Sequence, residues 1–433
     1  MVHMKANNSS IPILFATMVI VMIGFGIAIP LMPYYITHFQ ASGTALGLMM
    51  SLYSLMQFIF APLWGQLSDR MGRKPVLLIG IAGYFIAFVL QGFSQNLFQF
   101  IAARTLAGIL SSAALPTAMA FIADTTTPEN RSKGVGMMGA AMGLGMIIGP
   151  VLGGLLTKIQ LALPAGLTAL LQTTVDPSSG ALVNLSIPFF ASALLALLAL
   201  PFAHLLLPES LPLEARGHAS HARGSRLGAL AAGLRGPVGF LFVMAFLLAF
   251  ALANLESVLG LYGQSRFNLG PAEFGLLMGA MGILSVIMQG ALIGPITRRV
   301  GEENVLKSGL AVSMLGLVGL ALAPVKGLMV AAALVFSTGN VLLQPSVTAL
   351  ISRRSDPRQQ GAAMGLNNSF QSLGRGVGPL WAGAAFDIHS TLSFWSGALV
   401  QLIALVFALR LLGRPAETFT ASQQAGGEAS MLQ

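Results

Sequence analysis

Long apolar segments separated by short polar turns run through the whole chain. A helix that crosses a bilayer needs about 20 mainly apolar residues. Twelve windows meet this requirement: 11–33, 45–67, 76–94, 97–123, 133–157, 185–207, 237–262, 272–296, 305–324, 327–351, 361–386 and 392–412. The pattern therefore predicts an all-α membrane protein with twelve transmembrane helices, six in each half.

The two halves share a repeated sequence pattern. Residues 65–74, in the turn after the second window, return in altered form as residues 294–303, a shift of 229 positions (65 to 294). The same shift relates the glycine and proline pattern of residues 145–150 to that of residues 374–379. Two related membrane halves are typical of transporters whose halves rock around a central site. We therefore expect two pseudo-symmetric six-helix bundles.

The polar segments divide the chain into parts. We assign residues 1–207 to an N-terminal six-helix bundle, 208–236 to a linker, 237–413 to a C-terminal six-helix bundle and 414–433 to a disordered tail. The segment 158–184 is long for a loop between membrane helices. Two interpretations remain open for its Leu- and Ala-rich first part: a stretch along the membrane surface, or a disordered loop.

Composition supports the membrane class. Of the 433 residues, 55% are hydrophobic and 9% are charged, and the mean hydropathy is +0.79. Soluble globular proteins carry about 25% charged residues. The absence of cysteine excludes disulfides, thiolate metal sites and a thiol nucleophile. We expect no metal and no cofactor.

The distribution of basic residues predicts an orientation. Of the 23 Lys and Arg residues, Lys158, Arg266 and Lys326 fall on one side, and Arg104 and Arg375 fall within windows. The other 18 fall on the opposite side, which the positive-inside rule assigns to the cytoplasm. We therefore expect both termini in the cytoplasm of a bacterium, with the chain in its plasma (inner) membrane. The net charge of +9 then reflects this orientation, and no nucleic acid partner is expected.

The turn after the second window contains Gly65, Asp69, Arg70, Gly72 and Arg73. A glycine permits close helix approach or the positive φ of a tight turn. The aspartate can address the positive N-terminus of a neighbouring helix, while the basic residues offer partners to acids and lipid phosphates. Without further information, a plain positively charged loop would also explain this turn.

The whole pattern of residues 65–74 resembles the signature loop of the major facilitator superfamily. In that family the aspartate bonds across the interface to the eleventh span and holds the outward-facing state. The resemblance implies that Asp69 faces the start of that span near Gly361. The second copy has Arg298, Glu302 and Glu303 at the corresponding positions, so it is not expected to form the same lock.

The fifth window is dense in glycine, with Gly145, Gly149, Pro150, Gly153 and Gly154. Small residues four apart allow close helix packing in lipid, and proline kinks a helix. Generic close packing is one explanation. The pattern also resembles the signature of proton-driven drug antiporters within the superfamily, and this resemblance implies export.

Charged residues lie well inside windows of both halves, among them Arg104 and Glu256. An arginine at the bilayer centre costs about 2.5–3.5 kcal/mol on insertion scales, so Arg104 must face protein or water; it is either structural or, by resemblance to the family's span-4 motif, part of proton coupling. Glu256 is the one acid placed well inside a window. Burial favours its neutral form, which suits reversible protonation, and it can also attract a cationic drug.

The surroundings of Glu256, with residues 365–370 and 378–387, resemble NorA/Bmr-type multidrug transporters, in which a span-7 glutamate is important for transport. Arg375 departs from that type. Counted from the inner ends of their windows, Arg375 lies about 21 Å and Glu256 about 28 Å along their spans. An ion pair between them is one hypothesis, and a proton- or substrate-binding Glu256 is the other, favoured one.

Aromatic, methionine and amide side chains of the central windows are candidates for a promiscuous pocket, because methionine adapts its packing and aromatic rings stack on flat drugs. Ordinary helix packing is the alternative for each of them. The candidates are Phe25, Tyr34, Met56, Gln57, Phe58, Met119, Phe250, Asn254, Asn340 and Gln344.

The sequence thus predicts a monomeric secondary transporter that exports lipophilic or cationic drugs in exchange for protons, with membrane lipids as its surroundings. A tetracycline/proton antiporter is an alternative, since residues 50–157 also resemble that type. Export of a sugar, lipid or metabolite on the same fold is another. No nucleotide-binding motif is present, and the six histidines lie at window ends and in loops, so neither ATP drive nor enzymatic activity is expected.

Overall fold

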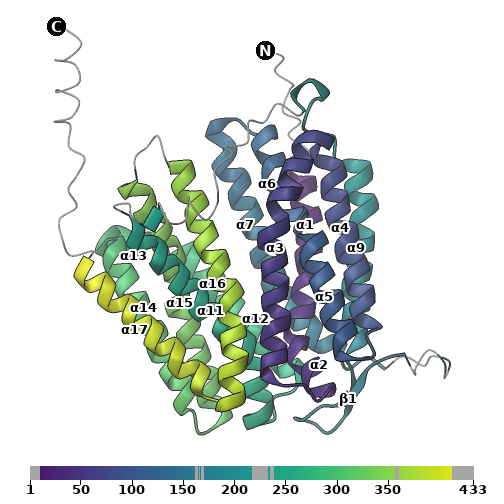
Figure 1. The fold of residues 1–433 in the computed structure, drawn as a ribbon, viewed down its shortest axis with the longest axis vertical. Coiled ribbons are helices and arrows are strands. Elements are labelled where there is room, and N and C mark those ends of the chain that lie inside the picture. The colour runs from purple at the N-terminus through teal and green to yellow at the C-terminus, as the bar shows by residue number, and fades with distance from the viewer. Residues whose placement is uncertain are drawn as a thin grey trace.

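The computed structural model describes residues 10–160, 164, 166, 170–216, 233–234, 238–355 and 360–411. The predicted tail and most of the predicted linker lie outside these residues. Within them the chain folds into two groups of helices that stand side by side (Figure 1). The predicted all-α membrane fold with twelve helical spans is confirmed.

The first group forms six spans. Span 1 combines α1 with a short 3₁₀ turn and α2, and span 4 combines α5 with α6. The elements are α1 (Ser10–Ala28), η1 (Ile29–Leu31), α2 (Met32–His38), α3 (Gly43–Met71), α4 (Arg73–Gly92), α5 (Leu97–Ser111), α6 (Ala114–Thr125), α7 (Pro128–Leu156) and α9 (Ser186–Leu206). A short 3₁₀ turn, η2 (Leu213–Ala215), follows.

The second group also forms six spans, and its second span contains a π-helical segment. The elements are α11 (Gly239–Phe267), α12 (Pro271–Ile287), η3 (Met288–Leu292), α13 (Ile293–Val300), α14 (Glu302–Leu322), α15 (Lys326–Arg354), α16 (Gln360–Ile388) and α17 (Leu392–Leu411). Eleven of the twelve described spans are apolar enough to cross a membrane on composition. The exception is α16, which is 29 residues long but carries a polar face.

The segment between α7 and α9 contains a small β-hairpin, which neither sequence-based interpretation of residues 158–184 predicted. Thr173–Val175 (β1) pairs antiparallel with Leu182–Asn184 (β2). The hairpin lies at the opposite end of the molecule from α6 and α13 (Figure 1). We call this end the hairpin side, and the end where α1 begins and α17 ends the termini side.

The two bundles meet on the hairpin side through backbone contacts at glycine. A Cβ at Gly43 or Gly47 of α3 would meet the backbone of Gly383 or Pro379 of α16. We call this contact the α3–α16 seam. Such close approach explains why glycine occupies these positions, since any side chain would separate the helices.

A second seam joins α7 to α12. A Cβ at Gly154 would lie 2.8 Å from Cα of Ala272, and one at Gly275 would meet the carbonyl of Pro150. The shift of 229 positions maps Gly154 onto Gly383 and places Ala272 at the position of Gly43. The two seams are therefore pseudo-symmetric copies of one contact, which agrees with an internal duplication.

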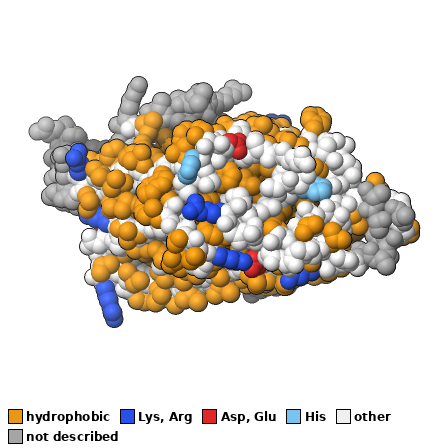
Figure 2. All heavy atoms as spheres, turned by 90° about the horizontal axis from the view of Figure 1, so that it is seen from below, with side chains coloured by type: hydrophobic (Ala, Val, Ile, Leu, Met, Phe, Trp, Pro, Cys, Tyr) orange, Lys and Arg blue, Asp and Glu red, His pale blue; other side chains and the backbone are white. Residues whose placement is uncertain are grey.

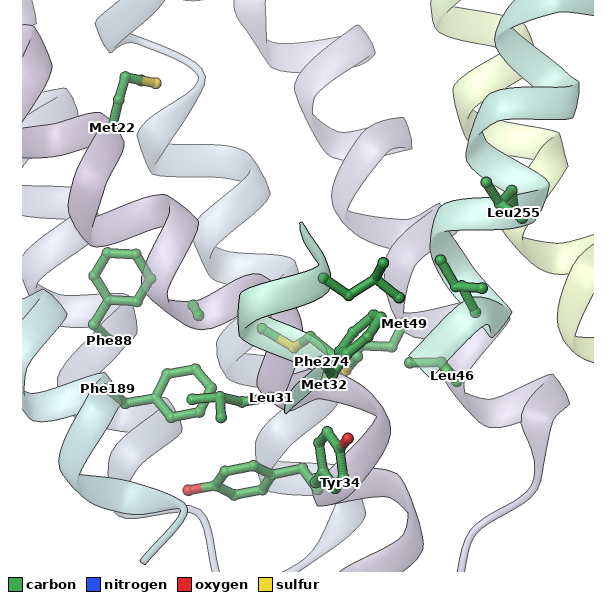
Figure 3. Close-up of a cluster of buried hydrophobic side chains, with 14 of the residues drawn as sticks. Met22, Leu31, Met32, Tyr34, Leu46, Met49, Phe88, Phe189, Leu255 and Phe274 are labelled. Carbon is green, nitrogen blue, oxygen red and sulfur yellow. The ribbon is translucent and has the colours of Figure 1, made fainter. Parts of the chain in front are cut away.

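Apolar side chains of both bundles fill the space between the seams. Figure 3 shows this buried cluster, to which η1, α2, α3, α11 and α12 contribute Leu31, Met32, Tyr34, Leu46, Met49, Leu255 and Phe274. Viewed from the hairpin side, the bundles form one continuous surface of hydrophobic and uncharged side chains with few charges (Figure 2). The hairpin side is therefore closed.

The termini side differs, because the same helices separate there. A Cβ at Gly65 of α3, Gly139 of α7, Gly290 of η3 or Gly361 of α16 would meet no neighbouring atom within 4 Å. Both seams thus end partway along their helices. Among the described residues these helix faces are uncovered on the termini side, and we call the space between them the inter-bundle opening.

Gly154→Ala tests the seam packing. The added Cβ would lie 2.6 Å from the carbonyl oxygen of Pro271, and overpacking of this kind costs about 1–3 kcal/mol. Because backbone atoms of the other bundle cannot yield locally, we expect the hairpin side to open more often. Met49→Cys, buried in the closed state, should then react faster with a membrane-impermeant maleimide, and the chain has no other cysteine.

Gly139→Ala on the same helix is the matched control, since its Cβ meets no atom within 4 Å. Equal labelling rates and equal melting temperatures for the two variants would contradict this account of the seam.

Candidate functional site

The turn between α3 and α4 is held by an arginine at the start of α4. The Arg73 guanidinium donates from Nε to Asp124 at 2.9 Å and from Nη1 to Ser68 at 2.7 Å and to Asp69 at 2.5 Å. Glu209, which follows α9, accepts from the backbone N–H of Arg73 at 2.7 Å. Gly72 has φ of +106°, as the sequence predicts for a tight turn.

The second bundle repeats this arrangement with its charges exchanged. Arg353 at the end of α15 pairs with Glu302 at the start of α14, at 2.9 Å. These positions correspond to Asp124 and Arg73 by the shift of 229. The acidic and basic partners have therefore changed places together. The reversed charges of residues 302–303 preserve a contact between neighbouring helices inside the bundle.

The predicted contact of Asp69 with the start of α16 stays a prediction. Neither Gly65 nor Gly361 has a neighbour within 4 Å of its Cβ position, because α3 and α16 are apart on the termini side. Arg70 is exposed. A lock between these helices on this side requires a conformation in which the opening has closed.

The glycines of α7 make two kinds of contact. A Cβ at Gly145 would meet Met22, one at Gly149 would meet Gly26 and one at Gly153 would meet Ile27, all on α1 of the same bundle. Gly154 and Pro150 instead face α12 across the seam. The glycine-rich helix α7 therefore packs closely on α1 within its own bundle and on α12 of the other bundle.

Arg104 is buried within the first bundle, at 2% exposure. Its guanidinium carbon lies 4.2 Å from the ring centroid of Tyr53 and 5.7 Å from that of Phe25. Its Nε and Nη1 atoms have no hydrogen-bond partner among the described residues. Cation–π attraction offsets part of the burial penalty, so an aromatic box takes the place of a carboxylate partner.

One face of α16 lines the inter-bundle opening. Its solvent-accessible positions Gly361, Gly365, Asn368, Ser372 and Arg375 follow one another at spacings of 4, 3, 4 and 3 residues, which places them on one side of a helix. Two further steps of four reach Pro379 and Gly383, which pack on α3. The polar face is thus the continuation of the seam, uncovered where the bundles separate.

Glu256 lies on the face of α11 that is directed toward the first bundle. It is solvent-accessible although residues 253–255 and 257–263 are all buried. Gly260, one turn further along, packs on Pro33 of α2 in the other bundle. Glu256 therefore points toward the first bundle, where the opening admits water to it.

The predicted ion pair between Glu256 and Arg375 is not formed in this structure. No nitrogen–oxygen contact within 4.0 Å joins them, although the two charges interact electrostatically over a longer distance. Counting from the span ends overestimated their proximity, because it does not fix the relative height of two helices. By the contacts of Gly374 and Gly378 with α11, Glu256 stands about 10 Å further along the helix axes than Arg375.

Several predicted pocket residues lie inside the first bundle, among its own helices. These are Phe25, Met56, Gln57 and Met119. Phe25 stacks on Tyr53 at 5.9 Å between ring centroids, and Gln57 donates to the Tyr53 hydroxyl at 2.9 Å. A Cβ at Gly108 would meet Met56, and Met119 packs against the core. Of these four, Phe25 contacts Arg104, and Gln57 is joined to it through the Tyr53 ring.

The remaining predicted pocket residues occupy different places. Asn254 is buried and donates to the Ser393 carbonyl of α17 at 3.0 Å, so it ties two helices together. Phe58 is half-buried on the face of α3 that continues from Gly47 and Gly65 toward the other bundle. The others described as half-buried are Phe250, Asn340 and Gln344.

A carboxylate that no sequence motif singled out as a functional residue links the two bundles. Asp387, at the end of α16, accepts from the backbone N–H groups of Gly43 at 2.7 Å and Thr44 at 2.8 Å, and from the Thr44 hydroxyl at 2.5 Å. Gly43 and Thr44 begin α3, so Asp387 caps a helix of the other bundle and meets its positive end. An acid directly after the eleventh window was the available signal.

Two hydroxyl contacts add to this link on the hairpin side. Tyr34 of α2 donates to the Leu269 carbonyl at 2.8 Å, and Thr37 donates to Oε1 of Gln264 at 3.1 Å. Both cross from the first bundle to the second. Tyr34, predicted to line the pocket, is thus a buried part of the closed side in this structure.

Two pseudo-symmetric six-helix bundles that are sealed on one side and open on the other define a multi-pass membrane transport protein. The chain matches the Major Facilitator Superfamily over residues 14–379 and again over residues 329–430. It belongs to this superfamily.

Similar proteins cover almost the whole chain. It is 32% identical over 409 residues to "Tetracycline resistance protein, class C" of Escherichia coli, with 91% of this chain and 93% of that protein covered. It is 30% identical over 410 residues to "Multidrug resistance protein 1" of Bacillus subtilis, with 94% and 97% covered.

The fold is also similar to that of a solved transporter, the inward open xylose transporter XylE from E. coli. The TM-score is 0.69 at 17% identity, and 94% of this chain and 97% of that chain are covered. At this identity the similarity supports the fold.

Asp387→Asn tests the link across the α3–α16 seam. The amide cannot supply a charged acceptor to two N–H groups and a hydroxyl, and loss of a helix cap costs about 0.5–2 kcal/mol. The closed hairpin side loses this free energy, so we expect faster maleimide labelling of Met49→Cys. Glu273→Gln, whose carboxylate accepts from Gly270 and Lys326 within the second bundle, is the control. Unchanged labelling in Asp387→Asn would contradict the assigned role.

Proposed function

We propose that this transporter exports lipophilic or cationic drugs across a bacterial plasma membrane in exchange for protons, as a monomer. The observation that supports the proposal most is Glu256, a carboxylate on the wall of the inter-bundle opening. The similarity to multidrug and tetracycline resistance proteins over more than nine-tenths of the chain supports the substrate class.

The basic residues predict how the transporter is oriented in the membrane. The sequence assigns 18 of the 23 Lys and Arg residues to one side of the membrane. Those that the structure describes, such as Arg70, Arg131 and Arg353, lie on the termini side, so this side faces the cytoplasm under the positive-inside rule. In the conformation described above, Glu256 and the polar face of α16 are then open to cytoplasmic substrate. Membrane lipids surround the apolar outer faces of the helices.

In this proposal, one aspartate at each end of the α3–α16 pair stabilises one of the two states. Asp387 caps α3 when the hairpin side is closed. Asp69 would address the start of α16 when the termini side closes, as in the superfamily signature. Export then proceeds by rocking α3 and α16 between one carboxylate contact and the other, while substrate and proton compete for the central site.

The proton gradient supplies enough free energy for this task. One elementary charge moving down about 100 mV releases about 2.3 kcal/mol. That amount sustains a roughly 50-fold concentration gradient of a neutral solute. The proposal therefore needs no ATP.

Tetracycline export is the second candidate. It is supported by the 32% identity to the class C tetracycline resistance protein and by the resemblance of residues 50–157 to that type. A susceptibility panel in an efflux-deficient host, with tetracyclines and several lipophilic cations, separates a narrow range from a broad one.

Glu256→Gln tests proton coupling. An amide cannot exchange a proton or attract a cation, so we expect export from loaded cells to fall to the level of cells that lack the transporter. In the wild type a protonophore should abolish export, and ATP depletion with the gradient maintained should not. Glu273→Gln is the control, because Glu273 pairs with Lys326 away from the opening. Export that follows ATP and ignores the gradient would refute the antiporter proposal.

Asp69→Asn tests the proposed lock on the termini side. Because it weakens the state opposite to the one that Asp387 stabilises, labelling of Met49→Cys should fall where Asp387→Asn raises it, and export should decline. Glu214→Gln, exposed on the same side, serves as the control. Wild-type export and labelling by Asp69→Asn at matched expression would exclude the lock.

A further inference from the structure

The inter-bundle opening presents one acid and one base to the same space. We infer that the site prefers zwitterionic substrates, with a substrate carboxylate at Arg375 and a substrate ammonium at Glu256. This inference rests on the proposed export function, because it assigns the chemical class of substrate to the same site.

Arg375 is the residue that carries the inference. It is solvent-accessible, lies on the polar face of α16 that looks toward the other bundle, and has no hydrogen bond or ion pair among the described residues. An arginine that served only the fold would be expected to pair with a carboxylate or with backbone carbonyls. A guanidinium with free donors in an opening suits a carboxylate ligand, which it can hold in a bidentate fashion.

Glu256 supplies the second charge on an adjacent helix. It faces the same opening from α11 and is not paired with Arg375 within 4.0 Å. Along the helix axes the two residues are about 10 Å apart. That separation leaves room for a rigid molecule that carries its acid and its amine at opposite ends.

The surroundings favour a defined direction of binding. Ser372 and Asn368 continue from Arg375 toward the termini side as accessible polar groups on the same face. Phe58 of α3 and Phe250 of α11 are half-buried aromatic side chains beside the opening. The substrate acid therefore points toward the termini side, its amine toward the hairpin side, and its apolar body lies against aromatic rings.

Charge balance explains why a zwitterion is favoured over a simple cation. When the opening closes and water leaves, each unpaired charge in the low-dielectric interior becomes costly. A zwitterion neutralises both protein charges, whereas a cation leaves Arg375 unpaired and repels it. A charged hydrogen bond contributes enough to change affinity about tenfold or more.

Binding of three forms of one fluoroquinolone to the purified transporter tests the inference. Norfloxacin carries both charges, its ethyl ester keeps only the amine, and its N-acetyl derivative keeps only the acid. For the wild type we expect Kd of the zwitterion to be about tenfold lower than that of either derivative. In Arg375→Gln the zwitterion should lose this advantage, while Kd of the ester stays unchanged or falls.

Two variants keep the result interpretable. Arg375→Lys retains a charge and should keep part of the preference, and Arg410→Gln, exposed at the end of α17, should keep all of it. Equal weakening of zwitterion and ester by Arg375→Gln, or no measurable binding of the zwitterion to the wild type, overturns the inference.

Export in proteoliposomes separates this inference from the proposed function. Gradient-driven export of the ester that persists in Arg375→Gln, together with selective loss of zwitterion export, supports both. Export of the ester with no preference for the zwitterion refutes the inference and leaves the antiporter intact. A panel of lipophilic cations that is not exported under any imposed gradient refutes the proposed function instead.

Discussion

The close approach of helix backbones across the two seams is the contact on which the rest of the structure depends. At Gly43 and Gly383, and again at Gly154 and Ala272, the bundles touch with almost no side chain between them. Such packing is strong only at short range. It therefore keeps the hairpin side closed and does not restrict the distance between the helices on the termini side. The helices can therefore diverge on the termini side of the seams. This divergence makes the polar face of α16 accessible.

Duplication supplied two equal seams, but only one of them carries a carboxylate cap. The positions that correspond to Asp387 and Thr44 in the α7–α12 seam are Lys158 and Glu273, and Glu273 turns instead to Lys326. Among the described residues, the α7–α12 seam thus shows packing contacts without a side-chain hydrogen bond between the two helices, while the α3–α16 seam adds charge-assisted hydrogen bonds. The ion pairs Arg73–Asp124 and Glu302–Arg353 differ from the seams in this respect. Each bundle keeps its ion pair, with the acidic and the basic residue exchanged between the two positions.

Much of the fold could be predicted because a bilayer restricts the chain to long apolar helices, and six windows per half follow directly. The windows ended too early, since α3 continues through the polar residues Asp69 and Arg70 to Met71. The charged positions of the site were also visible in sequence, because ionisable residues in membrane spans are rare. The cap at Asp387 was not, since its partner lies 344 positions away. Neither was the relative height of Glu256 and Arg375, which depends on glycine contacts between α11 and α16.

The distance between Glu256 and Arg375 affects which states of the transporter can close on the termini side. In the open state water solvates both charges, so they remain separate and available to a ligand. Closure on the termini side removes that water, and an unpaired charge then costs several kcal/mol. Two states compensate both charges and can close at low cost: one with a zwitterion bound between them, and one with the two side chains brought together. A state in which either residue is left as one bare charge closes at a higher cost, and this penalty favours movement with a zwitterionic substrate bound.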